Sequence, residues 1–315
     1  MNLIPIEKPE DFLLAEQFLL PHEETCVSLA SLVRRKSDKL IFITSSEKPV
    51  PETPETTLQS VLGILNLDST IYHCIPAPSL LDADFLKAQL PYLMKKPVRC
   101  ISGEKKATEF LIEICNSLKY DSDRASPAQL PEIVYDYKMM SWLSASEAGV
   151  SKTPESNVTS IPPSDYSTTL QLSGGEEIIR CTEHDMEALH LLQKDYMKGE
   201  VAVPGRTISA AEVDITLRNI LKNQLCFALT VDGDIVAKAN TNAIGINKVQ
   251  IGGVYTHPLY RRNGYAGALV TALCKRALRA GKQPVLFVKE KNMPAFALYQ
   301  KIGFTECGRY SIAYY

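Results

Sequence analysis

Two glycines and two arginines lie between an apolar strand and an apolar helix at residues 260–270, where the sequence reads YRRNGYAGALV. The first turn of a helix has backbone N–H groups without partners and carries partial positive charge. Gly264 and Gly267 would let an anion approach that backbone closely, and Arg261 and Arg262 would add positive charge. The segment therefore suits a pyrophosphate group. An ordinary turn with two solvated arginines is the alternative interpretation of so short a motif.

A second group of reactive residues follows one strand later, in KNMPAFALYQKIGF at residues 291–304. Pro294 suits the first turn of a helix, and Asn292 before it can donate and accept hydrogen bonds at the strand ends. Tyr299 falls within that helix, and its phenol can give a proton to a leaving group. Taken alone, Asn292 would be a helix cap and Tyr299 a packing aromatic. The glycine spacing differs from that of the P-loop and of the dinucleotide-binding turn, which excludes these standard nucleotide loops.

A mixed sheet in the second half of the chain must position both motifs. Strands are predicted at residues 177–181, 225–231, 235–243, 249–256, 284–288 and 309–314, and helices at residues 186–197, 210–222, 266–277 and 294–302. Thr182 is a predicted helix start, Asp232-Gly233 a hairpin turn and Gly281 a helix end. The order is β-α-α-β-β-β-α-β-α-β. Residues 284–288 are apolar throughout, as in a buried parallel strand.

The first half of the chain carries a weaker copy of that order. Strands are predicted at residues 39–45, 70–76, 98–102 and 133–137, and helices at residues 82–93 and 105–118. Strand, helix, strand, helix, strand matches the end of the second half, so an internal structural duplication is predicted. The turn before the first of these helices reads PAPSLLDAD and has no glycine. If this half is a duplicate, we expect it to be a silent one.

Composition places the boundary between the halves. Residues 144–175 are rich in Ser, Thr, Pro and Gly and show no apolar repeat, which is typical of a linker. The expected domains are therefore residues 1–143 and residues 176–315, joined by residues 144–175. The 315 residues suit two domains of ordinary size.

Composition also excludes several classes of protein. The 34 Lys and Arg against 36 Asp and Glu leave a net charge of -2, so neither a nucleic acid nor a membrane is an expected partner. Eight cysteines without a C-x-x-C pair argue against a zinc site and a disulfide framework, and no metal is expected. No apolar stretch approaches the roughly 18 residues of a membrane span. The N-terminus lacks the features of a signal peptide, and a cytoplasmic location is expected.

Together the two motifs resemble those of the GNAT superfamily of N-acetyltransferases. The family signature [QR]-x-x-G-x-[GA] is met by Arg261, Gly264 and Ala266. The companion motif of the family, N-x-P-A-x-x-x-Y-x-x-x-G-F, is met by residues 292–304. The resemblance covers residues 176–315. More loosely, the whole chain is similar to bacterial members that carry a degenerate acetyltransferase-like domain in front. It implies an α/β (α+β) fold of two GNAT-like domains, each a mixed, mostly antiparallel sheet flanked by helices.

The resemblance implies acetyl-CoA as co-substrate and assigns residues to it. Backbone groups of residues 254–256 would pair with the pantetheine arm, amides of residues 262–267 would hold the pyrophosphate, and Asn292 would bond the pantetheine. Tyr299 would be the general acid for the departing thiolate. The implied cofactor-binding residues are Val254, Tyr255, Thr256, Arg261, Arg262, Asn263, Gly264, Tyr265, Ala266, Gly267 and Asn292.

The general base does not follow from the family pattern. Many relatives have a glutamate on the strand before or after the coenzyme loop, whereas these strands read VQIGGVYT and PVLFV here. Glu200 is the candidate base, although a solvated loop carboxylate is the simpler interpretation. A water chain ordered by Gln250 or Tyr255 is the other option. His257 precedes a proline and is expected to shape the loop.

The leading hypothesis is an acetyl-CoA-dependent N-acetyltransferase that acts on a primary amine of a small molecule or peptide. One alternative is an N-acyltransferase with a longer acyl donor. The other is a non-catalytic CoA-binding sensor, for which the missing carboxylate would be the reason. The chain is expected to be a monomer or a homodimer.

Overall fold

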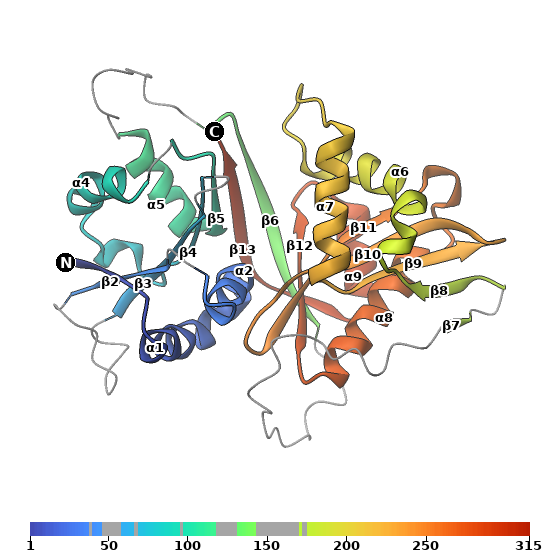
Figure 1. The fold of residues 1–315 in the computed structure, drawn as a ribbon, viewed down its shortest axis with the longest axis horizontal. Coiled ribbons are helices and arrows are strands. Elements are labelled where there is room, and N and C mark those ends of the chain that lie inside the picture. The colour runs from blue at the N-terminus through green and yellow to red at the C-terminus, as the bar shows by residue number, and fades with distance from the viewer. Residues whose placement is uncertain are drawn as a thin grey trace. The chain divides into compact units, whose positions relative to one another are not determined.

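The chain forms two compact units. The computed structural model describes residues 1–37, 40–45, 58–65, 69–94, 97–117, 131–142, 170–171 and 175–315. The first unit comprises Met1–Met139, Lys289–Lys291 and Cys307–Tyr315, and the second comprises Met140–Val288 and Asn292–Glu306. Figure 1 traces the chain through both units.

The second unit is a mixed sheet with helices on its two faces. Its elements are β8 (Glu177–Arg180), α6 (Met186–Tyr196), α7 (Ala210–Asn223), β9 (Cys226–Val231), β10 (Asp234–Ile244), β11 (Lys248–Thr256), α8 (Tyr265–Arg279), β12 (Gln283–Lys289) and α9 (Met293–Lys301). The strand order is β12-β11-β10-β9-β8-β7, where β7 is Leu170–Gln171. Neighbours are antiparallel except β11 and β12, which are parallel.

Local sequence signals explain where several of these elements begin and end. Ser209 and Glu212 bond reciprocally to each other's backbone amides, at 3.2 and 2.9 Å, and this capping box starts α7. Asp232 and Gly233 both have positive φ, 51° and 89°, as a two-residue hairpin turn requires between β9 and β10. Gly281, with φ of 67°, follows the end of α8.

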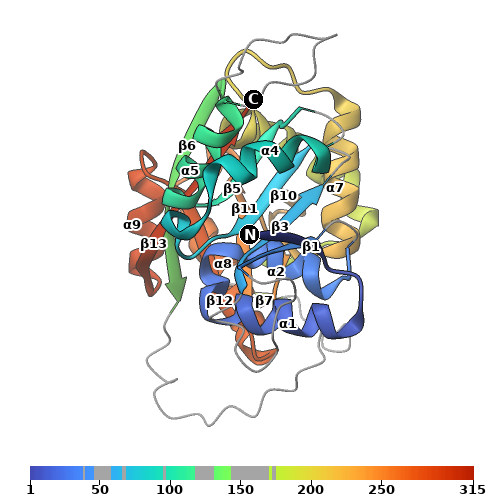
Figure 2. The ribbon, with the colours of Figure 1, turned by 90° about the vertical axis from the view of Figure 1, so that its left-hand side faces the viewer.

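The first unit has the same sequence of elements. They are β1 (Asn2–Pro5), α1 (Pro9–Leu19), α2 (Glu23–Arg34), β2 (Leu40–Thr44), β3 (Leu58–Leu65), β4 (Thr70–Cys74), α4 (Ala83–Leu93), β5 (Cys100–Glu104), α5 (Lys105–Asn116) and β6 (Ile133–Trp142). Figure 2 shows the strands between α4 and α5 on one side and α1 and α2 on the other. As in the second unit, the fourth and fifth strands, β4 and β5, are parallel.

This correspondence bears on the predicted fold. The order β-α-α-β-β-β-α-β-α-β occurs twice, which confirms two mixed α/β domains with the predicted topology. The sequence-based interpretation of the first half did not include β1, α1, α2 or β3, which the structure adds.

The last strand of each half crosses between the units. β13 (Phe304–Tyr314) begins in the second unit, but its residues from Cys307 onward belong to the first, where they pair with β5. β6 does the reverse, since Met140–Trp142 belong to the second unit. The units therefore differ from the predicted ranges 1–143 and 176–315. Most of the predicted linker, residues 144–175, lies outside the described residues.

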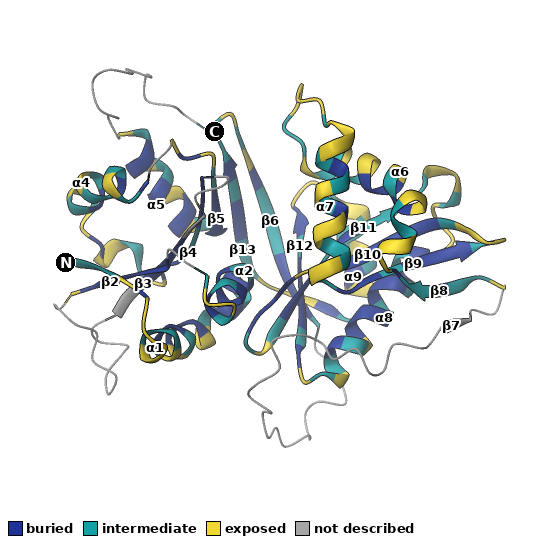
Figure 3. Cartoon of the chain, in the orientation of Figure 1, coloured by how far each residue is buried: buried dark blue, intermediate teal, exposed yellow. Residues whose placement is uncertain are grey.

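The core of the second unit lies on both faces of its sheet. On one face, buried side chains of α8, including Leu269, Val270 and Leu273, pack against β11 and β12. On the other face, a smaller cluster joins α6 and α7 to β9, with Leu189 and Leu217 at its centre. Figure 3 shows the buried strands and the exposed outer sides of α6 and α7. The site described next lies where the strands of this sheet separate.

Candidate functional site

The parallel strands β11 and β12 separate part of the way along the sheet. Their pairing runs from Lys248 with Gln283 to Ile251 with Leu286 and stops there. β11 continues for five more residues, to Thr256, and among the described residues this part pairs only with β10. The second half of β11 therefore has one open edge, in the middle of a sheet.

The backbone of β11 directs hydrogen-bonding groups toward that open edge. The amide of His257 donates to Val236 of β10 at 2.9 Å, and Lys238 is the register partner of Tyr255. Because backbone groups alternate between the two sides of a strand, the Val254 carbonyl and the Thr256 amide face away from β10. An extended ligand could pair with these groups as an added strand.

A β-bulge in β11 lies at the point of separation. Two residues of β11, Gly253 and Val254, stand opposite one residue of β10, because Asn240 pairs with Gly252 and Lys238 with Tyr255. Gly253 has φ of 59°, a conformation that favours glycine. A Cβ at Gly253 would overlap the Asn240 side chain. This position therefore requires glycine on two grounds.

The loop after β11 is held by its own polar side chains. The Arg261 guanidinium donates from Nε to the Thr256 carbonyl at 3.1 Å and lies over the Tyr255 ring. Asn263 Nδ2 donates to the Tyr260 carbonyl at 3.3 Å. His257 packs against Tyr260, with ring centroids 5.8 Å apart, which agrees with a loop-shaping part for this histidine. The side chain of Arg261 thus stabilises the loop itself.

Arg262 and Gly264 give the loop its approach to α8. Both have positive φ, 70° and 82°, and both are exposed. Such a φ is uncommon for a residue other than glycine and persists only where the surroundings enforce it. Nothing lies within 4 Å of the place where a Cβ on Gly264 would be, so the space in front of α8 is open.

The first turn of α8 has the amides that an anion needs. Ala268 is the first residue of the helix whose amide has an intrahelical acceptor, the Gly264 carbonyl at 3.0 Å. The amides of the turn before it have none within the helix, and they lie at its positive end. The segment predicted to hold an anion, residues 262–267, thus lies at the start of α8.

Gly267 and Tyr265 have packing tasks that the sequence did not indicate. A Cβ on Gly267 would be 3.3 Å from Leu298 Cδ1, so the absence of a side chain at this glycine brings α8 close to α9. The Tyr265 hydroxyl lies 3.1 Å from the Glu176 carboxylate and fixes the first turn of α8 beside β8. Both residues support the site through α8.

Helix α9 carries the second motif toward the same gap. Asn292 Oδ1 accepts a hydrogen bond from the Ala295 amide at 3.3 Å, so this side chain does cap the helix. Tyr299 is 8% exposed and packs edge to face on Phe304. Burial, followed by the neighbouring Tyr196 and Glu200, raises the pKa of the Tyr299 phenol. Tyr299 therefore keeps its proton at neutral pH.

Tyr196 and Glu200 lie near Tyr299, at the end of α6. Burial raises the pKa of Tyr196 to about 12, the charge of Glu200 adds to this, and a hydrogen bond from the Gly253 backbone acts in the opposite direction. Glu200 is half-buried in a π-helical turn, Met197–Val201, a geometry frequent at functional sites. The charge of Glu200 thus raises the pKa of both phenols. The sequence had placed Tyr196 only in a helical repeat.

Other candidates for the general base lie elsewhere or are engaged. The side chain of Gln250 is 9% exposed, on the part of β11 that still pairs with β12. His190 Nδ1 lies 2.9 Å from Asp214 Oδ1, joining α6 to α7. Of the described side chains discussed here, Glu200 is the carboxylate whose charge acts on Tyr299.

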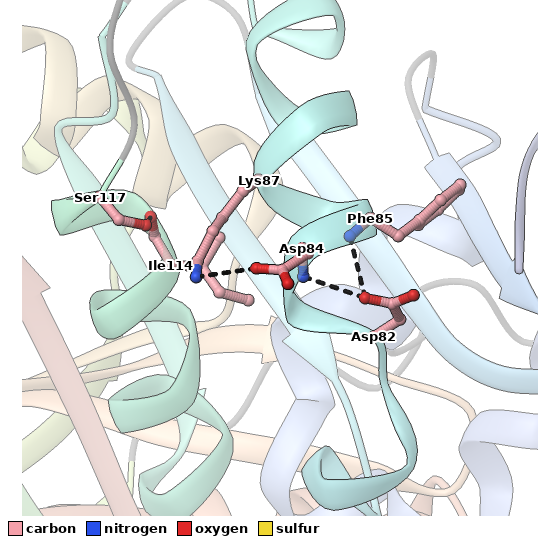
Figure 4. Close-up of polar contacts among 6 residues, drawn as sticks. All are labelled: Asp82, Asp84, Phe85, Lys87, Ile114 and Ser117. Atoms are coloured by element: carbon pink, nitrogen blue, oxygen red, sulfur yellow. Dashed lines mark hydrogen bonds and ion pairs between the residues drawn. The ribbon is translucent and has the colours of Figure 1, made fainter.

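In the first unit, amides at the corresponding helix start, that of α4, are already hydrogen-bonded to a side chain. Asp82 Oδ1 accepts hydrogen bonds from the amides of Asp84 and Phe85, both at 3.0 Å, and Asp84 pairs with Lys87 at 3.2 Å (Figure 4). Figure 4 also draws Ser117 of the neighbouring α5, whose hydroxyl donates to the Ile114 carbonyl at 2.7 Å. Two carboxylates thus occupy the end of α4 that would have to attract an anion.

The gap between strands β4 and β5 is also filled. Their pairing ends at Tyr72 and Ser102, and the next residue, His73, lies over Gly103, where a Cβ would overlap the ring. His73 Nε2 lies 2.9 Å from Thr108 Oγ1. Burial lowers the pKa of His73 to about 3, so the ring is neutral.

The described residues include no group of three or more His, Cys, Asp or Glu placed to hold a metal ion. No helix in the described part of the chain has the length and apolar character to cross a membrane.

Comparisons with known proteins fit this geometry. Residues 187–304 match the acetyltransferase (GNAT) family model. A Drosophila melanogaster protein matches with a TM-score of 0.62 and 13% identity over 99% of this chain and 98% of that one. A GNAT-family acetyltransferase from Colwellia psychrerythraea matches with a TM-score of 0.51 and 10% identity over 100% and 99%. No curated protein sequence matches. The chain carries an acetyltransferase (GNAT) family domain at residues 187–304, within a full-length fold that it shares with a GNAT-family acetyltransferase.

Proposed function

We propose that the second unit is an acetyl-CoA-dependent N-acetyltransferase that acts on a primary amine of a small molecule or peptide. The observation that carries this proposal is the separation of β11 from β12 directly ahead of the open first turn of α8. The family domain at residues 187–304 supports the transferase class. Acetyl-CoA would supply the acetyl group, held as a thioester.

Each segment of the site has a proposed task in binding. The open edge of β11 at residues 254–256 would pair with the pantetheine arm. The amides of residues 262–267 would hold the pyrophosphate, with Arg262 as a flexible cation beside them. Asn292 uses its carbonyl oxygen as a helix cap, which leaves its amide group for the pantetheine.

The chemistry requires three things of the protein. As the acceptor amine attacks the carbonyl carbon, a C–N bond forms and the C–S bond breaks. A bulge amide of β11 would stabilise the negative charge that develops on the carbonyl oxygen. Tyr299 would protonate the departing thiolate, and Glu200 is the proposed base that takes a proton from the amine.

Two alternatives remain for the same site. The strands β11 and β12 carry no carboxylate at residues 249–256 or 284–288, which favours a CoA-binding sensor. The buried phenol of Tyr299 favours catalysis, because a binder needs no proton donor there. A longer acyl donor is the third candidate, and it would need apolar space beside Tyr299.

The expected setting of the protein follows from charge and composition. We infer a cytoplasmic enzyme, a monomer or homodimer, that binds neither nucleic acid nor a membrane. The net charge of -2 supports this inference, since nothing in the balance of charges would draw the chain to a polyanion.

Acetyl-CoA binding tests the proposal through two glycines at opposite ends of α8. Gly264 and Gly281 both have positive φ, 82° and 67°, and open space in place of a Cβ. Gly264→Leu and Gly281→Leu should therefore destabilise the protein to a similar degree, about 1 kcal/mol. Only Gly264→Leu should abolish acetyl-CoA binding in calorimetry, because only its side chain enters the proposed anion site.

Turnover separates the candidate functions. Free thiol would be measured with acetyl-CoA, and with longer acyl-CoA donors, against a panel of primary amines. Release that depends on an amine identifies a transferase and its preferred donor. Binding without release for any donor supports the sensor. Absence of acetyl-CoA binding by the parent protein contradicts every function proposed for this site.

A further inference from the structure

A lysine lies buried beneath α6, beside the β11 bulge. Lys238 of β10 is 0% exposed, and its ammonium nitrogen is 5.1 Å from the centre of the Tyr196 ring. Its Nζ donates to the Gly253 carbonyl at 3.0 Å and to Asn240 Oδ1 at 3.1 Å. Both acceptors are neutral.

Such a lysine is costly for the fold. Taking an amine out of water without a paired carboxylate carries a large desolvation penalty, and no ion pair is formed by Lys238 among the described residues. Burial lowers the pKa of Lys238 accordingly. An apolar side chain of similar length would fill the space at lower cost, so the two hydrogen bonds need a reason.

The bond to Gly253 controls the direction of one peptide unit. Because a peptide bond is planar and trans, the carbonyl of Gly253 and the amide of Val254 point in opposite directions. Lys238 holds that carbonyl, and it thereby sets the direction of the Val254 N–H. This peptide is the bulge of β11, at the point where the strand loses its partner β12.

The residues around Lys238 hold the same bulge. Asn240 accepts from Lys238 and donates from Nδ2 to Asn242 Oδ1 at 3.0 Å, and these two amides occupy the space left by Gly253 and Gly252. A hydrogen bond from the Gly253 backbone to Tyr196 holds the peptide unit just before it, Gly252–Gly253. The bulge is thus fixed from β10 and from α6.

We propose that Lys238, supported by Asn240, is a positioning residue that aims the Val254 amide at the carbonyl oxygen of the thioester. This rests on the function proposed above. Lys238 touches neither substrate; it acts through the Gly253–Val254 peptide. Its loss should weaken stabilisation of charge on the carbonyl oxygen and leave the pyrophosphate and pantetheine contacts in place.

Lys238→Met tests this, with Lys282→Met as the matched control. Lys282 is also buried, 4% exposed, and also donates to two backbone carbonyls, Gly245 at 3.0 Å and Ile246 at 2.6 Å. It lies at the other end of β11, where the strand still pairs with β12. The carbonyl stretch of bound acetyl-CoA labelled with carbon-13 at the thioester would be recorded by infrared spectroscopy, together with kcat and KM.

The parent protein should lower the carbonyl frequency relative to free acetyl-CoA, as a hydrogen-bonded thioester does. In Lys238→Met most of that shift should be lost, and kcat should fall roughly 10- to 100-fold while KM for acetyl-CoA changes by no more than about twofold. Lys282→Met should keep both the shift and kcat, whatever it does to the melting temperature.

Three outcomes would decide against the inference or its basis. Lys238→Met with an unchanged shift and unchanged kcat overturns it, and so does a bound parent complex with no shift. Absence of any bound signal in the parent contradicts the proposed function itself. If Lys238→Met fails to fold, Lys238→Leu, which also removes the hydrogen bond to the Gly253 carbonyl, provides the same comparison, and retention of the full shift in that variant also overturns the inference.

Discussion

Electrostatic interactions link three side chains from two helical segments of the second unit. Tyr196 ends α6, Glu200 lies in the π-helical turn after it, and Tyr299 comes from α9, more than a hundred positions later in the sequence. Their mutual influence is visible in the raised pKa of both phenols, for which burial is the first cause and Glu200 a further one. A phenol in such surroundings is a poor base and a well-kept proton source.

Tyr299→Phe should lower kcat for thiol release roughly 100-fold, because the thiolate loses its proton donor. In the parent protein the raised pKa of Tyr299 keeps the phenol protonated beyond its ordinary value of about 10. The rate should therefore show no alkaline decline from this group below that pH. Steady-state rates between neutral and alkaline pH measure both.

Tyr310→Phe is the control for this change. Tyr310 is also a buried tyrosine whose pKa is raised by burial, but it lies in the first unit and bonds Ser102 at 2.7 Å. Its loss should cost stability and leave kcat unchanged. Equal turnover in the parent and in Tyr299→Phe would remove that residue from the mechanism.

The sequence predicted the role of a single residue where the type of that residue alone indicates its conformation. Gly264 was predicted to require its glycine, and its φ of 82° agrees. Gly267 was assigned to the anion, and its missing Cβ also serves packing on Leu298, which the sequence did not indicate. The burial of Lys238 could not be predicted, because a lysine in a strand normally points to solvent. Its burial depends on a helix more than thirty residues earlier in the chain.

Helix starts distinguish the two units at the scale of single elements. Both α4 and α8 follow the strand that pairs in parallel with the next one along the chain. The N-cap of α8 is Gly264, and the space where its Cβ would be is open. The N-cap of α4 is Asp82, whose carboxylate accepts hydrogen bonds from two amides of the first turn. An anion would meet free donors at α8 and a negative charge at α4.

Asp82→Ala should therefore lower the free energy of unfolding of the first unit by about 1 kcal/mol, the usual cost of losing an N-cap. It should leave the affinity for acetyl-CoA unchanged, since the ligand is expected at α8. Denaturant unfolding and calorimetry would measure the two quantities. A stoichiometry of two ligands per chain, or an affinity that responds to Asp82, would contradict this view of α4.

The elements themselves were predictable to different degrees. In the second half, apolar periodicity and caps such as Ser209 with Glu212 agree, so both the order and type of elements follow from the sequence. In the first half, Pro21 lies in a 3-10 turn, Leu20–His22, between α1 and α2. Neither helix was predicted, because the proline between them interrupts the helical period of the sequence.

The whole molecule is organised by two strands that leave their own halves. The last residues of β13 pair with β5, from Tyr310 with Glu104 to Tyr314 with Cys100. The end of β6 joins the second unit, where the Trp142 indole donates to the Ile302 carbonyl at 2.7 Å. Neither partner choice could be derived from the sequence, since periodicity identifies a strand and says nothing of its distant neighbour.

A chain that ends at residue 306 should therefore lose stability in its first unit. Without the end of β13, strand β5 still pairs with β4 on one side but loses its partner on the other, and the hydroxyl of Ser102 loses Tyr310. Hydrogen exchange should become faster in β5, and the exposed edge should promote aggregation. The first turn of α8 should remain as protected as in the full chain. Unchanged protection of β5 would contradict this account of the fold.

The same crossing strand sets an order in time. During synthesis, the N-terminal part of a chain ordinarily folds while the rest is still being made. Here β5 is complete at residue 104, but its partner in β13 appears only with residues 310–314. The first unit therefore cannot close its sheet until about two hundred further residues have left the ribosome, at a synthesis rate of roughly 5–20 residues per second. The first unit is therefore synthesised first, but its sheet is completed only with the last residues of β13.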